Sequence, residues 1–184
     1  MPGQKLQLKT QSLFLILVGD GVEYRSKYYT VIEKFGIKEH VYFTGFQKNP
    51  YKYMAKCSCF VLSSLSEGFP NVLAEAMTLG LPVIATNCLS GPAEILRKDN
   101  NYDAVSEHFE ECDYGLITPR MTEDNNENAI CQLANAINTL LSDEEMMRRY
   151  AMLSKQRVND FSQDSISEKL NEILNELLER RKIK

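Results

Sequence analysis

Short, unbroken apolar runs alternate with amphipathic helical patterns along this chain, and this alternation limits the fold more than any other feature. The run Leu13–Val18 is too short for an independent helix and is apolar throughout, which is typical of a strand buried on both faces. Equivalent runs recur, and strands are expected at Leu13–Val18, Val41–Thr44, Cys59–Ser63, Val83–Thr86 and Tyr114–Ile117. Buried strands that alternate with helices predict an α/β fold with a doubly wound parallel sheet.

Helices are expected between these strands and throughout the last third of the chain. Expected helices cover Tyr24–Phe35, Tyr51–Lys56, Asn71–Leu79, Pro92–Leu96, Ile130–Leu141, Asp143–Val158 and Ile166–Leu178. Ser142 and Glu145 have the spacing of a capping box for the sixth of these. We therefore expect a poorly structured segment over residues 1–12, a Rossmann-like domain over 13–160 and an amphipathic helix within 161–184. The basic end of that helix suits the helix dipole, and a membrane or partner contact is the alternative.

Composition excludes several classes of protein. The 184 residues have 43% hydrophobic and 25% charged side chains, as in a soluble globular domain, and a net charge of −4 argues against a dedicated nucleic-acid binder. We see no run of about 20 apolar residues that could span a bilayer and no export signal, so a cytoplasmic location is expected. The five cysteines include no CxxC pair, so each is expected to be a small buried residue, and no metal site is expected.

The segment Lys98–Asp113 is polar and acidic and is expected to form a long excursion between the last two strands. Long loops in compact domains are often functional, whereas a solvated surface loop is the simpler interpretation. The sequence leaves both open.

Chemistry is concentrated where the third strand ends. Doubly wound sheets bind ligands beyond the carboxyl ends of their strands, and here Ser63 leads through Glu67, Gly68, Phe69 and Pro70 into a helix. Pro70 suits a helix start. The amides of Asn71, Val72 and Leu73 should then be free to bind a phosphate. Gly68 would let a ligand approach the backbone closely.

Two carboxylates bracket this anion site. Glu67 precedes the helix and Glu75 lies one turn inside it, and both would repel a phosphate unless they serve other groups. A ligand with hydroxyls on both sides of a diphosphate satisfies this condition, because carboxylates accept hydroxyl hydrogen bonds well. A nucleotide-sugar has this layout. The alternative is that both glutamates are ordinary acids near a helix N-terminus.

The segment Glu67–Thr86, EGFPNVLAEAMTLGLPVIAT, resembles the Glu-x7-Glu signature of retaining GT-B glycosyltransferases of family 4, the glycosyl transferases group 1. Flanking blocks are similar in order and spacing: LILVGDG at 15–21, VYFTGF at 41–46, CFVLS at 59–63 and NCLSGPAEIL at 87–96. The resemblance covers about residues 13–141 and matches the C-terminal, donor-binding half of such enzymes. The SGPAEIL form of the last block is similar to that of bacterial members of the family that build capsule, lipopolysaccharide O-antigen or protein-linked glycans, and the resemblance implies such a role here.

The resemblance also implies a role for individual residues. Glu67, the catalytic candidate, would contact hydroxyls of the transferred sugar, and Glu75 would hold the ribose hydroxyls of the donor nucleotide. The remaining donor-binding candidates are backbone amides and loop residues: Gly68, Phe69, Asn71, Val72, Leu73, Gly19, Gly21, Phe46 and Gln47. The donor is expected to be a UDP-sugar with GDP as the next choice, and the leaving diphosphate is stabilised without a metal or other cofactor.

Two parts of the family pattern find no match in the sequence. Family members begin this domain with a strand and helix that carry an Arg and a Lys for the donor diphosphate, and nothing in Met1–Ser12 matches them. The acceptor site belongs to the other domain. We therefore expect weak donor binding and no transfer by this chain alone. A free sheet edge or apolar surface is also expected, and with it self-association.

The intact enzyme is expected to use a glycan or lipid-linked acceptor, with no nucleic-acid partner, and can contact the cytoplasmic face of the membrane peripherally. A non-catalytic Rossmann-like module that binds a nucleotide or a partner protein is the alternative function. A GT-B epimerase or phosphorylase is a weaker one, because no motif here marks a pyridoxal-phosphate lysine.

Overall fold

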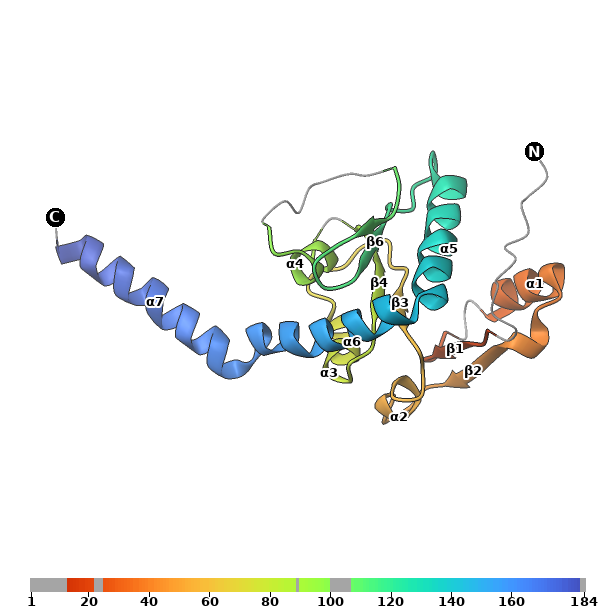
Figure 1. The fold of residues 1–184 in the computed structure, drawn as a ribbon, viewed down its shortest axis with the longest axis horizontal. Helices are drawn as coiled ribbons and strands as arrows, with labels where there is room; N and C mark the ends of the chain where they lie inside the picture. Colours follow the sequence, from red (N-terminus) through yellow and green to blue (C-terminus); the bar gives the residue numbers. More distant parts are fainter. Residues whose placement is uncertain (1–12, 22–24, 89, 100–106, 183–184) are drawn as a thin grey trace.

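The computed structural model describes residues 13–21, 25–88, 90–99 and 107–182. Its strands are β1 (Leu15–Val18), β2 (Val41–Gly45), β3 (Phe60–Leu62), β4 (Val83–Thr86), β5 (Glu110–Glu111) and β6 (Leu116–Thr118). Its α-helices are α1 (Arg25–Phe35), α2 (Tyr51–Met54), α3 (Asn71–Thr78), α4 (Pro92–Leu96), α5 (Asn126–Ser142), α6 (Glu144–Arg157) and α7 (Gln163–Lys182). The alternation of strands and helices confirms the predicted α/β architecture (Figure 1).

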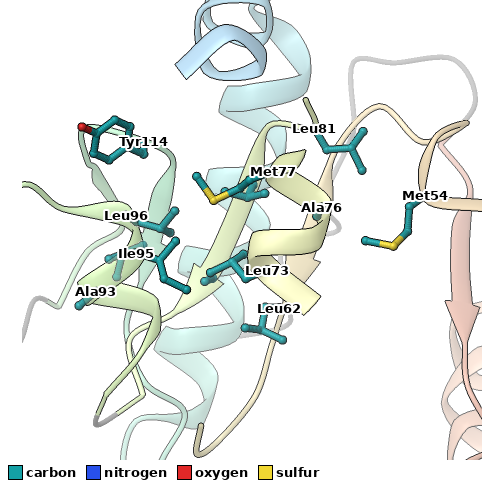
Figure 2. Packing of buried hydrophobic residues seen from close by; sticks show 13 residues of the cluster. Met54, Leu62, Leu73, Ala76, Met77, Leu81, Ala93, Ile95, Leu96 and Tyr114 are labelled. Carbon is teal, nitrogen blue, oxygen red and sulfur yellow. The ribbon is translucent and has the colours of Figure 1, made fainter. Parts of the chain in front are cut away.

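The main sheet has the order β3-β4-β6-β5, and its first three strands are parallel. Strands β4 and β6 are buried along their whole length, as their apolar sequences predict. Leu73 and Met77 of α3 pack on one face with Ile95 and Leu96 of α4, as Figure 2 shows. Helices α5 and α6 cover the other face. The short antiparallel strand β5 was not predicted, because it has two glutamates and no apolar pattern.

The first two strands do not join this sheet. Among the strands that the structure describes, β1 pairs with β2 alone, in a separate parallel pair that Figure 1 shows beside the main sheet. In a doubly wound sheet of order 3-2-1-4-5-6, a central strand joins the two halves of the sheet. No strand of the described residues lies between the β1–β2 pair and the main sheet in this way. One edge of β1 and one edge of β3 are therefore unpaired among the described residues.

The predicted burial of the first strand–helix unit is wrong as a result. Leu15 and Val18 of β1 are exposed, and of the apolar face predicted for α1 only Ile32 is buried. Tyr28, Val31 and Phe35 of that face are exposed because a two-stranded sheet offers α1 too little surface to cover. Tyr24 lies outside the described residues. This apolar surface is the kind that was expected to mediate self-association, which stays a prediction.

Two helix ends illustrate where the sequence signals hold and where they fail. Gly80 has a φ of +74° and ends α3 in a Schellman motif, with Gly80 N–H donating to Met77 O and Leu81 N–H to Ala76 O. The predicted capping box at Ser142 is wrong. Ser142 is still helical, and Asp143 caps α6 by accepting from the amides of Glu145 and Met146 at 2.9 Å. Aspartate and serine are about equally favourable N-cap residues, so the sequence spacing does not distinguish Ser142 from Asp143 as the cap.

Helix α7 leads away from the rest of the molecule, and its apolar stripe is exposed (Figure 1). No helix in the part of the chain that the structure describes is both long and apolar enough to cross a bilayer.

The acidic segment 98–113 is tied down at both described ends. Arg97 pairs with Glu110 at 2.5 Å, and the Lys98 amide donates to Asp113 at 2.9 Å. Asp99, Cys112 and these acids line a hollow of about 340 Å³. Residues 100–106 lie outside the described residues, so the role of the segment stays open.

Burial of Cys59 predicts a loss of stability in alkaline solution. Burial, assisted by the charge of Cys57, raises the pKa of the Cys59 thiol to about 11. The folded state thus favours the neutral thiol, and its stabilising effect is complete below the pKa of an unfolded thiol and is lost as pH rises through 11. We expect Cys59 to contribute a fall of up to about 2 kcal/mol in the free energy of unfolding across this range.

Urea unfolding of Cys59→Ala at several pH values measures this contribution, since the fall should be smaller than in the wild type. Cys131→Ala removes an exposed thiol and is the matched control. Equal alkaline losses in the wild type and Cys59→Ala would contradict the assignment.

Candidate functional site

The connection between β3 and α3 holds Glu67 in place at the carboxyl edge of the main sheet. The Ser64 hydroxyl donates to Glu67 Oε1 at 2.6 Å, and the Thr86 hydroxyl at the end of β4 donates to Ser64 O at 2.6 Å. Glu67 is half-buried. Its carboxylate therefore has a fixed position and keeps oxygen lone pairs for further hydrogen bonds.

The loop between β4 and α4 packs against the turn that carries Glu67. The Ser90 hydroxyl donates to the backbone oxygen of Glu67 at 2.7 Å. Gly91 lies directly against Gly68 O and the Pro70 ring, where a side chain has no room. Gly68 itself has open space at its Cα, as the prediction of close ligand approach requires.

The start of α3 offers fewer free amides than predicted. Pro70 is the N-cap rather than the first helical residue, and its carbonyl accepts from the Leu73 amide at 2.9 Å. Leu73 N–H is therefore used, and Leu73 is fully buried. The amides of Asn71 and Val72 have no acceptor among the described residues, so two rather than three donors can face an anion.

Glu75 has a different neighbour from Glu67. Its carboxylate lies beside the hydroxyl of Tyr51 in α2, and the charge of Glu75 raises the pKa of Tyr51, with smaller contributions from burial and from their hydrogen bond. Met54 of α2 also packs on α3 next to Ala76 (Figure 2). Helix α2 thus joins the first strand pair to the helix that carries Glu75.

The remaining predicted residues lie on the first strand pair. Gly19 and Gly21 line a hollow of about 310 Å³ with Asp20, Arg25 and residues of β1, α1 and β2, and no residue of 67–75 lines it. Arg25 lies 4.0 Å from Asp20. The Gln47 amide donates to Thr44 O at 2.8 Å, and Phe46 is 71% exposed. Phe69 is also half-exposed and packs edge-on against Phe161.

The structure therefore places the candidates from Glu67 to Val72 on one turn. Glu75 contacts Tyr51 of α2. The Gly19–Gly21 turn lines a separate hollow. Sequence reasoning missed two residues at these places, Ser64 and Tyr51, and it did not consider Arg120. Ser64 could have been considered, because a serine three residues before a glutamate can donate its hydroxyl to the carboxylate, as Ser64 does here. Arg120 follows the last parallel strand, where the rule on carboxyl ends applies equally.

Comparison with known proteins gives a consistent result. The model of the family "Glycosyl transferases group 1" matches residues 4–111. The chain is 36% identical over 161 residues to an uncharacterized glycosyltransferase of Methanocaldococcus jannaschii, covering 83% of the chain and 39% of that protein.

A second relative and a solved structure extend this similarity. The chain is 32% identical to the N-acetylgalactosamine-N,N'-diacetylbacillosaminyl-diphospho-undecaprenol 4-alpha-N-acetylgalactosaminyltransferase of Campylobacter jejuni, covering 88% of the chain and 38% of that enzyme. The crystal structure of Anabaena HepE in complex with UDP superimposes with a TM-score of 0.70 and 25% identity, covering 93% of this chain and 43% of HepE. The chain thus spans about two fifths of the length of these proteins.

Proposed function

The chain belongs to the family of glycosyl transferases group 1, and from this premise we propose that it is the donor-binding part of a retaining transferase of family 4. The donor would be a nucleotide-sugar, with UDP as the nucleotide, and the acceptor a glycan or a lipid-linked saccharide in the synthesis of a bacterial surface polysaccharide. The observation that carries the proposal is the turn from Glu67 to Val72, where a hydrogen-bonded carboxylate precedes two amides that have no acceptor among the described residues. The HepE complex with UDP and the undecaprenol-linked substrate named for the Campylobacter enzyme support the choice of donor and acceptor classes.

The proposed arrangement gives each group one task. The amides of Asn71 and Val72 and the positive end of α3 bind the diphosphate, so no metal is needed for its charge. Glu75 accepts hydrogen bonds from the ribose, and Glu67, held by Ser64, accepts from hydroxyls of the transferred sugar. Phe46 and Gln47 would lie near the base, and the Gly19–Gly21 turn would face the cleft.

Transfer itself requires an acceptor. The acceptor hydroxyl oxygen bonds to the anomeric carbon on the face that the diphosphate leaves, the bond from that carbon to the phosphate oxygen breaks, and the hydroxyl proton moves to the departing phosphate. Configuration is thereby retained. The acceptor would be positioned by a further domain, so we propose that this chain alone binds donor weakly and transfers no sugar. We place the intact enzyme in the cytoplasm, with peripheral contact to the membrane face where a lipid-linked acceptor would lie.

An NMR titration of the ¹⁵N-labelled chain with UDP and UDP-glucose tests the donor site. We expect shifts at the amides of Gly68, Asn71 and Val72, with a dissociation constant in the high micromolar to millimolar range. The reason is that the Arg and Lys contacts expected in the family are unmatched here, and two charge-assisted contacts are worth roughly tenfold to thousandfold in affinity. Uridine, which lacks the diphosphate, is the control ligand.

Two results would count against the proposal. No shift at these amides with UDP in the tens of millimolar would remove the donor site, and low-micromolar affinity would contradict the expected weak binding. The alternative function is a Rossmann-like module that binds a nucleotide or a partner protein without serving a transferase. Transferase activity of a polypeptide that contains these residues would exclude it.

A further inference from the structure

Arg120, in the loop after β6, has no role in the donor binding proposed above. It follows β6 in the loop that leads to α5, at the same carboxyl edge of the main sheet as Glu67. In the described residues of the loops after β3, β4 and β6 (63–70, 87–91 and 119–125), Arg120 is the single lysine or arginine. The edge that should receive an anionic ligand therefore has one cationic side chain.

Two buried side-chain atoms at the end of β6 have no hydrogen-bond partner among the described residues. Thr118 is 1% exposed, and its hydroxyl oxygen is buried without a hydrogen bond in the described structure. Its neighbour across the strands, Thr86, has the same burial, but its hydroxyl donates to Ser64 O. Arg120 Nε is likewise buried without a hydrogen-bond partner. Buried polar groups in native proteins are normally satisfied, so this strand end has donors without acceptors.

Arg120 also has no carboxylate partner among the described residues. The ion pairs found there use other arginines, namely Arg25, Arg97, Arg148, Arg149 and Arg157. Arg97 has an unpartnered Nε as well, but its Nη2 bonds Glu110. A partly buried guanidinium with no counter-charge is unfavourable unless another molecule supplies one.

The loop after β4 connects the end of β6 to the Glu67 turn. The Asn87 amide of this loop donates to Thr118 O at 2.8 Å, and its Ser90 hydroxyl donates to Glu67 O at 2.7 Å. Cys88, buried at the end of β4, is affected by both Glu67 and Arg120: burial raises the pKa of its thiol, the Glu67 charge raises it further, and the Arg120 charge lowers it. The charges of Glu67 and Arg120 both affect the Cys88 pKa, which agrees with this arrangement of the loops. In the proposed function Glu67 contacts the transferred sugar, so Arg120 is placed on the sugar side of the donor, whereas Glu75 and Tyr51 are on the nucleotide side.

We propose that Arg120 binds an anionic oxygen group of the nucleotide-sugar beside Glu67, and so is a further substrate-binding residue. The group is an oxygen of the diphosphate or a carboxylate on the transferred sugar, since a guanidinium recognises both with paired hydrogen bonds. This inference rests on the proposed donor-binding function.

Binding of three ligands to the 184-residue chain tests it. UDP, UDP-glucose and UDP-glucuronate are titrated by NMR into the wild type, Arg120→Gln and Arg120→Lys, with Arg148→Gln as the control for loss of an exposed arginine. We expect Arg120→Gln to weaken binding of the recognised anion about tenfold or more, which corresponds to one charged hydrogen-bonding group. Arg120→Lys should recover part of the affinity because it keeps the charge and loses the planar fork.

The pattern over the ligands identifies the anion. An equal loss for all three assigns Arg120 to the diphosphate, and a loss confined to UDP-glucuronate assigns it to the sugar carboxylate. Unchanged affinity for all three in Arg120→Gln, with UDP still bound by the wild type, would overturn this inference and leave the donor site intact. Absence of binding by the wild type would instead refute the donor site, and this inference with it.

Thermal unfolding separates binding from a structural role. Because the guanidinium has no partner in the described structure, Arg120→Gln should unfold at the same temperature as the wild type or higher. A midpoint lowered by more than about 4 °C would show that Arg120 holds the fold together and would overturn the inference.

Discussion

Replacing Glu75 with glutamine should weaken binding of UDP by about tenfold to a hundredfold, because a carboxylate that accepts ribose hydroxyls makes charge-assisted hydrogen bonds of about 1.5–3 kcal/mol. Glutamine keeps the size of the side chain and one oxygen acceptor but removes the charge. Glu75 is half-buried on α3 with Tyr51 as its neighbour, so its carboxylate is already held on the side of the helix that faces α2. The measurement is the dissociation constant of UDP from an NMR titration.

A second ligand makes the test specific to the ribose. For 2′,3′-dideoxy-UDP, which lacks both hydroxyls, the wild type and Glu75→Gln should bind equally weakly. Glu145→Gln, an exposed glutamate in the first turn of α6, is the control for loss of one negative charge. If Glu75→Gln binds UDP more tightly, the carboxylate only repels the diphosphate, and its assignment to the ribose is wrong.

The sequence predicted the main sheet well because β4 and β6 have neighbouring elements on both faces, as their apolar sequences require. Val83–Thr86 is apolar on both faces, and α3 and α5 cover it, so local pattern and tertiary packing agree. β1 has an equally apolar sequence, yet Leu15 and Val18 are exposed. Its burial depends on neighbouring strands that a local pattern does not specify.

The candidate site shows the same division. The Glu67-to-Glu75 spacing, the helix start and the open Gly68 could be predicted from residue types. The structure places Glu67 and Gly68 on the connection between β3 and α3, and Glu75 inside α3. The residues that contact Glu67 and Glu75 could not be predicted in this way. Tyr51 reaches Glu75 from 24 positions earlier in the chain, and Ser90 reaches Glu67 from 23 positions later. Such contacts depend on how loops meet in space.

Gly91 connects the stability of the fold to the geometry of the site, and Gly91→Ala should have the largest effect on both. Gly91 has φ +78° and ψ −72°, a conformation that L residues adopt only with strain of about 1–3 kcal/mol. A methyl group there would also overlap Gly68 O and would lie 2.5 Å from Pro70 Cδ, so the backbone must move at a further cost of about 1–3 kcal/mol. We expect a total of about 3 kcal/mol and a melting midpoint lower by about 6–12 °C in a chain of this length.

A second glycine provides the matched control. Gly36 also has a positive φ, +63°, but nothing lies within 4 Å of a Cβ at that position, so Gly36→Ala should cost only the conformational strain of about 1 kcal/mol. Because the displaced group in Gly91→Ala is the Gly68–Pro70 turn, this variant should also lose the UDP-induced shifts at Asn71 and Val72 at temperatures where it is still folded. Equal melting midpoints for the two variants would show that the contact between Gly91 and Gly68 is not tight. Normal UDP binding by a destabilised Gly91→Ala would show that the turn tolerates movement, and the donor site would then not depend on the support given by the β4–α4 loop.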